Sequence, residues 1–251
     1  MVNIDKLKFW KKPPIIEFFC HPDFEDVIPK PTVAGKNIPN WFKKLPMEVD
    51  VLEKNQTGQE IKSSILTAKA CLPLLDAMTL GYTIPLCGDV RIVTNHDCSQ
   101  ILSRDSNLFT VAEFHNSSQV GGQNGIKKNN GNPIKFVNRW IIKTAPGWST
   151  FFIPPVNSFD NPHFTCLSGF VDTDKYPKEI NFPAIWHTPD FNGIISAGTP
   201  LVTAIPFKRD TIVNTVNIRK IKPEDMKLID TMTKIQRSRD HYYTKELRVK
   251  K

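Results

Sequence analysis

The sequence has few glycines and no long apolar run. Only 12 of its 251 residues are glycine, whereas 20 are proline. Proline interrupts helices and occurs in turns and at sheet edges, so this composition argues against an all-helical fold. The chain has no apolar run of about eighteen residues, and Met1 to Lys12 form no continuous apolar stretch. We therefore expect neither a transmembrane helix nor a secretory signal, and no membrane partner.

Several common functional signatures are also missing. The five cysteines form no CxxC pair, which argues against a zinc ribbon and a disulfide framework and favours a reducing cytoplasm. The chain contains no GxSxG, Walker, GxGxxG or HExxH motif. The six histidines lack the spacing of an iron-binding facial triad. We predict no metal site, and the sequence leaves any cofactor unknown.

Positive charge is concentrated at one end of the chain. The net charge is +8, and from Lys208 to Lys251 there are 13 Lys or Arg against 6 Asp or Glu, a net +7. The rest of the chain carries a net +1. We interpret the basic end as a solvated, solubilising segment, and an acidic partner or a nucleic acid is the rival interpretation.

The chain divides into three regions on its patterning. Residues 1–63 are punctuated by prolines and predict an extended arm packed on the body, with one strand at Ile15–Cys20 and a polar loop over 53–63. Residues 64–222 form the body, which opens with a short helix before Gly81. Residues 223–251 form a basic helix that begins at Pro223, because acidic residues follow that proline and bases crowd the far end. Its apolar side is expected to dock on the body or on a neighbouring subunit.

The body is expected to be mainly β. Short β-rich runs recur, separated by turn residues, and a Gly- and Asn-rich loop is expected over 116–132. The pattern favours an antiparallel sandwich or barrel. The runs are Tyr82–Pro85, Val90–Val93, Leu108–Phe114, Ile134–Val137, Trp140–Lys143, Thr150–Ile153, Thr165–Val171, Leu201–Pro206 and Ile212–Ile218.

Two carboxylates stand out as a candidate site. Asp172 and Asp174 are two residues apart, so in an extended chain both side chains point to the same side. Two desolvated like charges raise the pKa of one of them, which suits a general base. The alternative interpretation is an Asp-rich turn whose side chains bond backbone amides.

Five segments follow one another in a characteristic order along the body: Leu80–Pro85, Trp140–Ser149, Pro154–Asn157, Gly169–Tyr176 and Ile195–Val202. Their order and spacing resemble the dUTPase-like family, which has a β-clip fold, over about residues 80–207. The body is therefore expected to be of β-clip or jelly-roll type. The resemblance implies that Asp172 is a general base and that Tyr176 stacks on a ligand, with Asp174 and Gly169 in the same ligand-binding hairpin.

The chain departs from that family at its charged positions. Thr83 stands where the family has an acid, Val156-Asn157 replace Arg-Ser at the phosphate turn, and Thr203 replaces a glutamine. The missing groups are those that neutralise transition-state charge. The sequence therefore argues against pyrophosphate hydrolysis and leaves open whether the protein is an enzyme.

A resemblance over nearly the whole chain is to an uncharacterised family of tailed phages and bacteria. The strings that carry it include Cys71–Met78, Ile142–Trp148 and Val171–Tyr176. It implies a phage-type protein, either in the host cytoplasm or in the virion. Two hypotheses follow: a β-clip protein that binds a nucleotide or other small ligand near Asp172, or a non-enzymatic structural or assembly protein. Self-association as a homo-oligomer is expected in either case.

Overall fold

The protein is mainly antiparallel β, as the sequence predicted. A computed structural model describes residues 15–54, 58–96, 98, 101–105, 109–121, 132–212, 216–238 and 248–249. Every pairing between the described strands is antiparallel. The chain forms two compact units, Met1–Lys44 with Ala77–Thr211 and Leu45–Asp76 with Ile212–Lys251.

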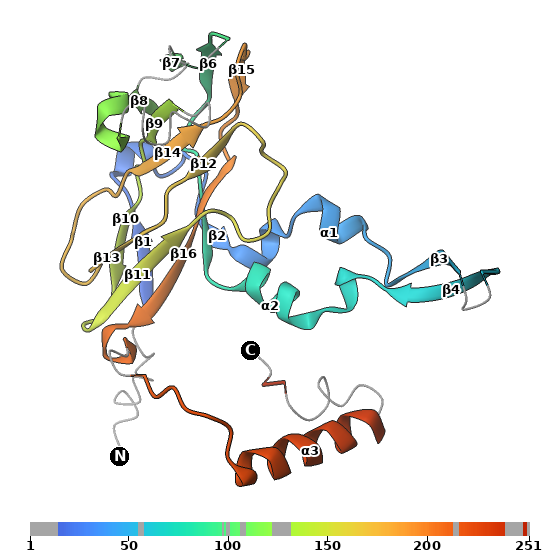
Figure 1. Cartoon of the computed structure of the whole chain (residues 1–251). Coiled ribbons are helices and arrows are strands. Elements are labelled where there is room, and N and C mark those ends of the chain that lie inside the picture. Colours follow the sequence, from blue (N-terminus) through green and yellow to red (C-terminus); the bar gives the residue numbers. More distant parts are fainter. Residues whose placement is uncertain are drawn as a thin grey trace, which may run out of the picture. The chain divides into compact units, whose positions relative to one another are not determined.

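The larger unit contains four of the sheets formed by the described strands (Figure 1). The five-stranded sheet has the order β13-β11-β16-β5-β2, from strands Gly169–Val171, Trp148–Ile153, Pro200–Lys208, Tyr82–Pro85 and Thr32–Val33. The four-stranded sheet has the order β12-β14-β9-β8, from Phe164–Cys166, Phe182–Trp186, Asn132–Phe136 and Ala112–Phe114. The others are β15-β6-β7, from Asn192–Ile195, Val90–Thr94 and Ile101–Asp105, and β1-β10, from Ile16–Phe19 and Ile141–Thr144.

The apolar runs build one core between these sheets. Alternate side chains of β6 are buried, as expected for a strand with one face toward a core. Consecutive residues of β5 and of the first half of β16 are buried, so both faces of these strands are covered. Large apolar side chains from all of these sheets meet in a single cluster, with Trp186 and Phe136 fully buried at its centre.

Most of the predicted strands of the body are present, and two predictions are wrong. The run Thr165–Val171 is two strands, β12 and β13, because the chain passes there from the four-stranded to the five-stranded sheet. Residues 212 and 216–218 are not strand, and 213–215 lie outside the described residues. Most of the predicted 116–132 loop, residues 122–131, also lies outside them, and Ser117–Val120 form a short 3-10 helix.

The proline-rich N-terminal region is more regular than the sequence indicated. Its predicted strand is β1, and β2 adds an edge strand to the five-stranded sheet. The helix α1 (Asn40–Lys44) is anchored by the buried Phe42 and by the Trp41 indole, which donates to the Asn157 carbonyl at 2.8 Å. β1 and β2 therefore pair with strands of the body, β10 and β5.

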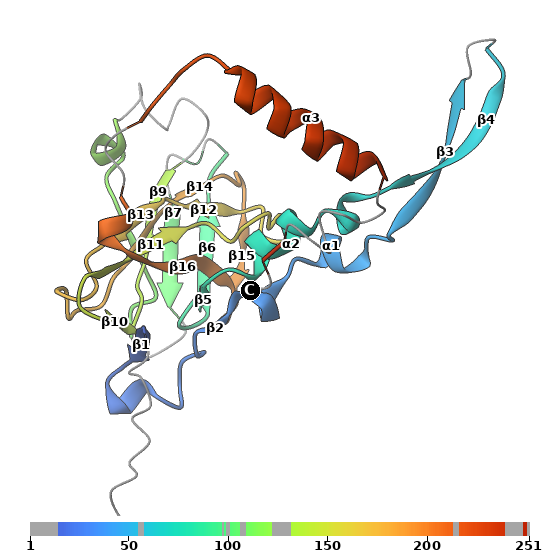
Figure 2. The ribbon, with the colours of Figure 1, turned by 90° about the horizontal axis from the view of Figure 1, so that it is seen from below.

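The smaller unit contains a long hairpin and a helix (Figure 2). Strands β3 (Glu48–Lys54) and β4 (Glu60–Leu66) pair along all seven of their residues. The sequence predicted a polar loop over 53–63. Residues 53–54 and 60–63 belong instead to the two strands, 58–59 lead into β4, and 55–57 lie outside the described residues.

The predicted short helix is α2 (Leu72–Thr79), and the helix predicted over 223–251 is present as α3 (Pro223–Ser238). α3 carries three acidic and three basic residues. Most of the bases expected at its far end fall at 239–247 and 250–251, which lie outside the described residues, and residues 248–249 are not helical. No helix in the described part of the chain is long and apolar enough to cross a membrane.

Candidate functional site

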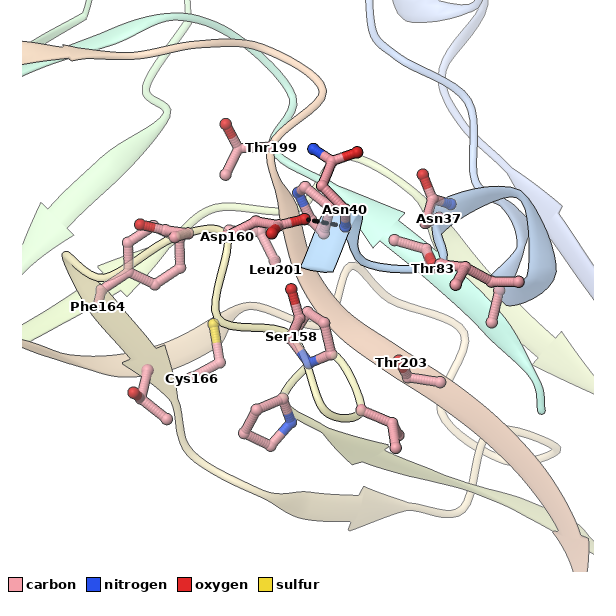
Figure 3. Close-up of a pocket in the computed structure, with 18 of the residues that line it drawn as sticks. Asn37, Asn40, Thr83, Ser158, Asp160, Phe164, Cys166, Thr199, Leu201 and Thr203 are labelled. Carbon is pink, nitrogen blue, oxygen red and sulfur yellow. Dashed lines mark hydrogen bonds between the residues drawn. The ribbon is translucent and has the colours of Figure 1, made fainter. Parts of the chain in front are cut away.

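A cavity of about 550 Å³ lies in the larger unit (Figure 3). Its volume is within the range of sites that hold small organic molecules. Its floor is formed by the five-stranded sheet and by β12, and its mouth by the segment around α1 and by the turn that follows β11. The cavity is therefore built from sequence-distant segments that sheet pairing brings together.

Two threonine hydroxyls define the floor. Thr83 of β5 and Thr203 of β16 are direct cross-strand partners and both line the cavity. They are 5% and 3% exposed. Both side chains line the cavity, where a hydroxyl can donate to or accept from a polar group of a ligand. This pair therefore gives the largely apolar floor two polar groups.

The rest of the floor is mainly apolar, and its one thiol is not activated. Phe164, Leu201 and Cys166 line the cavity and are almost fully buried. Burial raises the pKa of the Cys166 thiol to about 12. At neutral pH this thiol stays protonated, and the thiolate is the nucleophilic form. Cys166 is therefore a packing residue of the floor and not an activated nucleophile.

The mouth of the cavity is charged. Its charged lining residues are Lys36, Lys43 and Asp160. The Asp160 carboxylate accepts a hydrogen bond from the backbone N–H of Asn40 at 3.2 Å (Figure 3). Both lysines and Asp160 are exposed. The lining thus carries one more positive than negative charge, which favours an anionic group at the mouth.

A histidine lies at one side of the cavity and is held by aromatic rings. His163 stacks on Trp186 with ring centroids 5.8 Å apart, and its Nδ1 is 3.0 Å from the Thr188 hydroxyl. Burial lowers the pKa of His163, so the neutral imidazole is favoured at neutral pH. The neutral His163 imidazole therefore contributes an uncharged polar side chain to the cavity lining.

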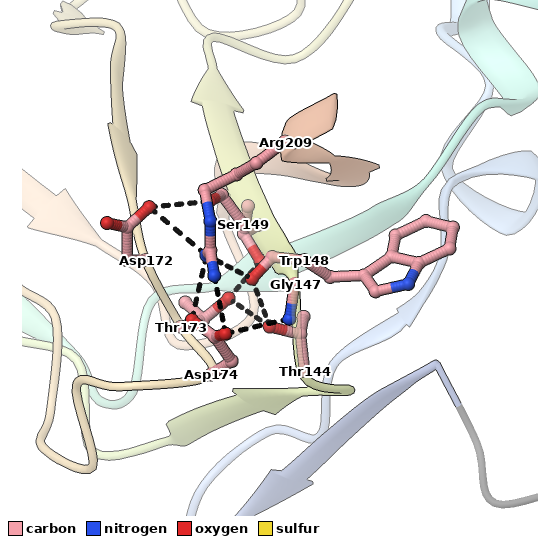
Figure 4. A network of polar contacts seen from close by, with 9 residues as sticks. Thr144, Gly147, Trp148, Ser149, Asp172, Thr173, Asp174 and Arg209 are labelled. Atoms are coloured by element: carbon pink, nitrogen blue, oxygen red, sulfur yellow. Dashed lines mark hydrogen bonds and ion pairs between the residues drawn. The ribbon is translucent and has the colours of Figure 1, made fainter. Parts of the chain in front are cut away.

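The two carboxylates singled out by the sequence lie elsewhere, in a cluster around Arg209 (Figure 4). The Arg209 guanidinium donates to both carboxylate oxygens of Asp174, at 2.6 and 2.8 Å, and the Gly147 N–H donates to Asp174 at 2.9 Å. The Asp174 side chain is 6% exposed. Hydrogen bonding to Arg209 is the main cause that holds the pKa of Asp174 well below its usual range. Asp174 is thus a permanently charged anchor for Arg209.

Asp172 takes a looser place in the same cluster. It accepts a hydrogen bond from the Ser149 hydroxyl at 2.6 Å, and Arg209 approaches it at 3.4 Å. Its side chain is half exposed. The space beside Asp172 is filled by Arg209 and Ser149, so the expected pair of unneutralised carboxylates does not form. The observed arrangement is close to the alternative interpretation, a turn tied by its aspartates.

The remaining residues of the predicted ligand hairpin are exposed. Tyr176 is 44% exposed, and Gly169 lies at an exposed position at the start of β13. None of the four predicted residues lines the 550 Å³ cavity. Sequence reasoning missed Arg209 because it follows β16, far along the chain from the aspartates. It did point to Thr83 and Thr203, but only as positions where the dUTPase-like family has other residues.

No cluster of histidine, cysteine or acidic side chains in the described part of the chain is suited to hold a metal ion. The cysteines are free thiols. His96 instead pairs with Asp190 at 3.0 Å, and His187 lies 2.9 Å from the Thr165 hydroxyl. His96 and His187 are thus engaged in local polar contacts.

Comparison with known proteins adds no relative: no protein-family model matches the chain, and no curated protein matches it.

Proposed function

We propose that this is a phage-type protein that binds a small organic anion in the cavity above Thr83 and Thr203. The observation that carries the proposal is the cross-strand pair of threonines, Thr83 and Thr203, in the floor of a cavity whose lining also includes Lys36 and Lys43. The hydroxyls would hydrogen-bond a carbonyl, amide or hydroxyl of the ligand, and the lysines would neutralise its anionic group. Phe164 and Leu201 would contact its apolar body.

A mononucleotide is the ligand class that we favour. It combines a phosphate, a polar base edge and an apolar ring face, and its size suits a cavity of about 550 Å³. The sequence resemblance supports this choice, because Thr83, Val156 and Thr203 stand at positions where the dUTPase-like family has functional residues, and all three line the cavity. The lining offers no activated nucleophile, so we propose binding rather than pyrophosphate hydrolysis.

Isothermal titration calorimetry tests the proposal with deoxyuridine and adenosine monophosphates, uridine and inorganic phosphate as probes. We expect a monophosphate to bind more tightly than uridine or phosphate alone, because it engages both the floor and the mouth. Thr203→Val keeps the side-chain shape and removes one hydroxyl, and Lys36→Gln removes one charge. Each should weaken binding about tenfold, the effect of roughly 1.4 kcal/mol.

The control is Lys178→Gln, which removes an exposed lysine outside the cavity and should bind like the unchanged protein. The proposal is wrong if no probe binds at millimolar concentration. It is also wrong if Thr203→Val and Lys36→Gln bind every probe as tightly as the control does.

A further inference from the structure

An exposed aromatic ring stands beside the mouth of the cavity. Phe159 is 75% exposed, the highest value among the described phenylalanines. Its two neighbours in the chain, Ser158 and Asp160, both line the cavity. A single exposed apolar residue is common on protein surfaces, so its surroundings decide what it means. Here the ring adjoins a cavity in which we propose that a nucleotide binds.

The turn that carries this ring has few alternative conformations. It begins with Pro154-Pro155, whose rings fix the backbone. Asn157 has a φ of +53°, in the left-handed region that asparagine enters more readily than most residues. The Ser158 N–H donates to the Pro155 carbonyl at 3.2 Å. Phe159 is therefore presented by a closed turn rather than by an open loop.

The helix α1 fastens this turn from the other side of the mouth. The Trp41 indole donates to the Asn157 carbonyl at 2.8 Å, and the Asn40 N–H donates to Asp160 at 3.2 Å. The rings of Trp41 and Phe159 lie 6.1 Å apart between centroids, with their planes 41° apart. Trp41 thus supports Phe159 while most of the phenylalanine surface stays in water. A ring that is already held in place loses little conformational freedom when a ligand covers it.

Positive charge accompanies the ring. Lys36 and Lys43 line the cavity together with one acid, Asp160, and α1 ends in Lys43-Lys44. Proteins bind single-stranded nucleic acids with the same combination, because lysines attract the phosphates and an aromatic ring stacks on a base of any identity. An apolar protein partner would use the ring but not the charges. The mouth therefore suits a nucleotide better than an apolar peptide.

The spacing also suits a second nucleotide. Phe159 is one residue from Ser158 and from Asp160, and consecutive Cα atoms are about 3.8 Å apart. Neighbouring phosphates of one DNA strand are separated by a similar distance along the helix axis, about 3.4 Å. A base that stacks on Phe159 can therefore belong to the nucleotide next to the one in the cavity.

We propose that Phe159 is a stacking platform for a second base, and that the cavity and its mouth bind two consecutive nucleotides of a single-stranded nucleic acid. One nucleotide occupies the cavity, the phosphate that joins the two lies at the mouth, and the next base covers Phe159. This inference rests on the proposed function, because it needs the first nucleotide in the cavity. It changes the ligand class from a free mononucleotide to a short stretch of a nucleic acid strand.

The first test is isothermal titration calorimetry of the full chain with the deoxyuridine and adenosine monophosphates and with the dinucleotide of each. Two analogues of each dinucleotide, each lacking one of the two bases, serve as ligand controls. We expect a dinucleotide to bind about tenfold more tightly than its monophosphate and than either analogue, because only the dinucleotide fills the cavity and covers the ring. Deoxyribose and ribose forms of the dinucleotide distinguish DNA from RNA.

Variants of the ring separate stacking from apolar contact. Phe159→Leu keeps an apolar side chain and removes the ring, so it should lose the tenfold gain of the dinucleotide and bind the monophosphate unchanged. Phe159→Tyr keeps the ring and should keep the gain. The matched control is Phe170→Leu: Phe170 is 63% exposed, lies 6.2 Å from one other ring, that of Phe207, and is outside the cavity lining. This control should bind every probe like the unchanged protein.

The outcomes distinguish this inference from the proposed function. If no monophosphate and no dinucleotide binds, both are wrong. If the monophosphates bind and the dinucleotides bind no more tightly, the second site is wrong and the cavity proposal stands. The stacking platform is also wrong if Phe159→Leu keeps the gain, or if Phe170→Leu loses it to the same extent.

Discussion

Three buried threonines share one directed chain of hydrogen bonds beneath the aspartate turn. The Thr144 hydroxyl donates to the Trp148 carbonyl at 3.0 Å, so it must accept from Thr173 at 2.7 Å. Thr173 in turn accepts from Thr150 at 2.8 Å. All three residues are less than 5% exposed. Thr173 therefore fixes the turn from within, and its neighbours Asp172 and Asp174 point away from the core.

Thr173→Val should destabilise the fold by about 2 kcal/mol, because it leaves the hydroxyls of Thr144 and Thr150 with a lost partner in a buried place. Thr173→Ser keeps the hydroxyl and should cost less than half as much. Urea unfolding followed by tryptophan fluorescence measures both. Equal losses for the two variants would show that the methyl group, and not the hydroxyl, stabilises the turn.

At the residue scale the sequence identified a real cluster but not its chemistry. The spacing of Asp172 and Asp174 predicted two carboxylates on the same side of an extended chain, with an aspartate-rich turn as the alternative. The structure places the two residues at a turn, beside Arg209. Their neutralisation by Arg209 was beyond sequence reasoning, because that contact depends on the pairing of β16 with β11, which a single sequence does not reveal. The two cavity threonines could not be identified from the sequence either, because a threonine that lines a cavity has the same local sequence pattern as any other strand threonine.

At the scale of elements, one glycine sets the junction between α2 and β5. Gly81 has a φ of +79°, a conformation that side chains disfavour. A β-carbon at this position would lie 2.4 Å from the Ala204 carbonyl oxygen of β16. Gly198 has a similar φ of +87°, but a β-carbon there meets nothing within 4 Å. Substitution at Gly198 would therefore measure the cost of the backbone conformation alone, whereas substitution at Gly81 would add the cost of the close approach to Ala204.

We expect Gly198→Ala to lower the free energy of unfolding by about 1 kcal/mol, the cost of the left-handed conformation. Gly81→Ala should cost about 3 kcal/mol or more, because β16 must also move. Chemical denaturation of the two variants side by side provides the measurement. If the two losses were equal, the approach to Ala204 would contribute nothing.

Sequence patterns located most strands of the body because their apolar runs are short and bounded by turn residues. They failed where burial is partial. β3 and β4 mix charged with apolar residues, and most of their apolar side chains are exposed. The sequence of this segment therefore predicted a polar loop. β7, β14 and β15 were missed, and the run at 165–171 was divided, because a run of apolar residues does not show which sheet each half joins.

At the scale of the whole molecule, acidification should act in two stages. Burial lowers the pKa of His163 and His187 in the folded protein, so the unfolded chain binds more protons as the pH falls below about 6.5. The pKa of Asp174 is also lowered, so its stabilising contribution is present above about pH 4 and is lost as the pH falls through its folded pKa.

We therefore expect the free energy of unfolding to be constant from about pH 7 to pH 8, to fall below about pH 6.5, and to fall again below about pH 4. Each titrating histidine contributes at most about 1.4 kcal/mol per pH unit. Urea unfolding at a series of pH values measures the profile. His163→Gln should reduce the first decline, and an unchanged slope between pH 7 and pH 5 in this variant would contradict the assignment.

The position of β16 has a consequence for folding during translation. This strand is the middle of the five-stranded sheet and the last of its strands to be made. Until Lys208 has been translated, β2 with β5 and β11 with β13 are two half-sheets that nothing joins, each with an open strand edge. Open edges are where nascent chains pair wrongly. The growing polypeptide must therefore protect the β5 edge from foreign partners once Pro85 has been made, and the β11 edge as well once Val171 has been made. A message truncated before Pro200 encodes two halves without their shared central strand.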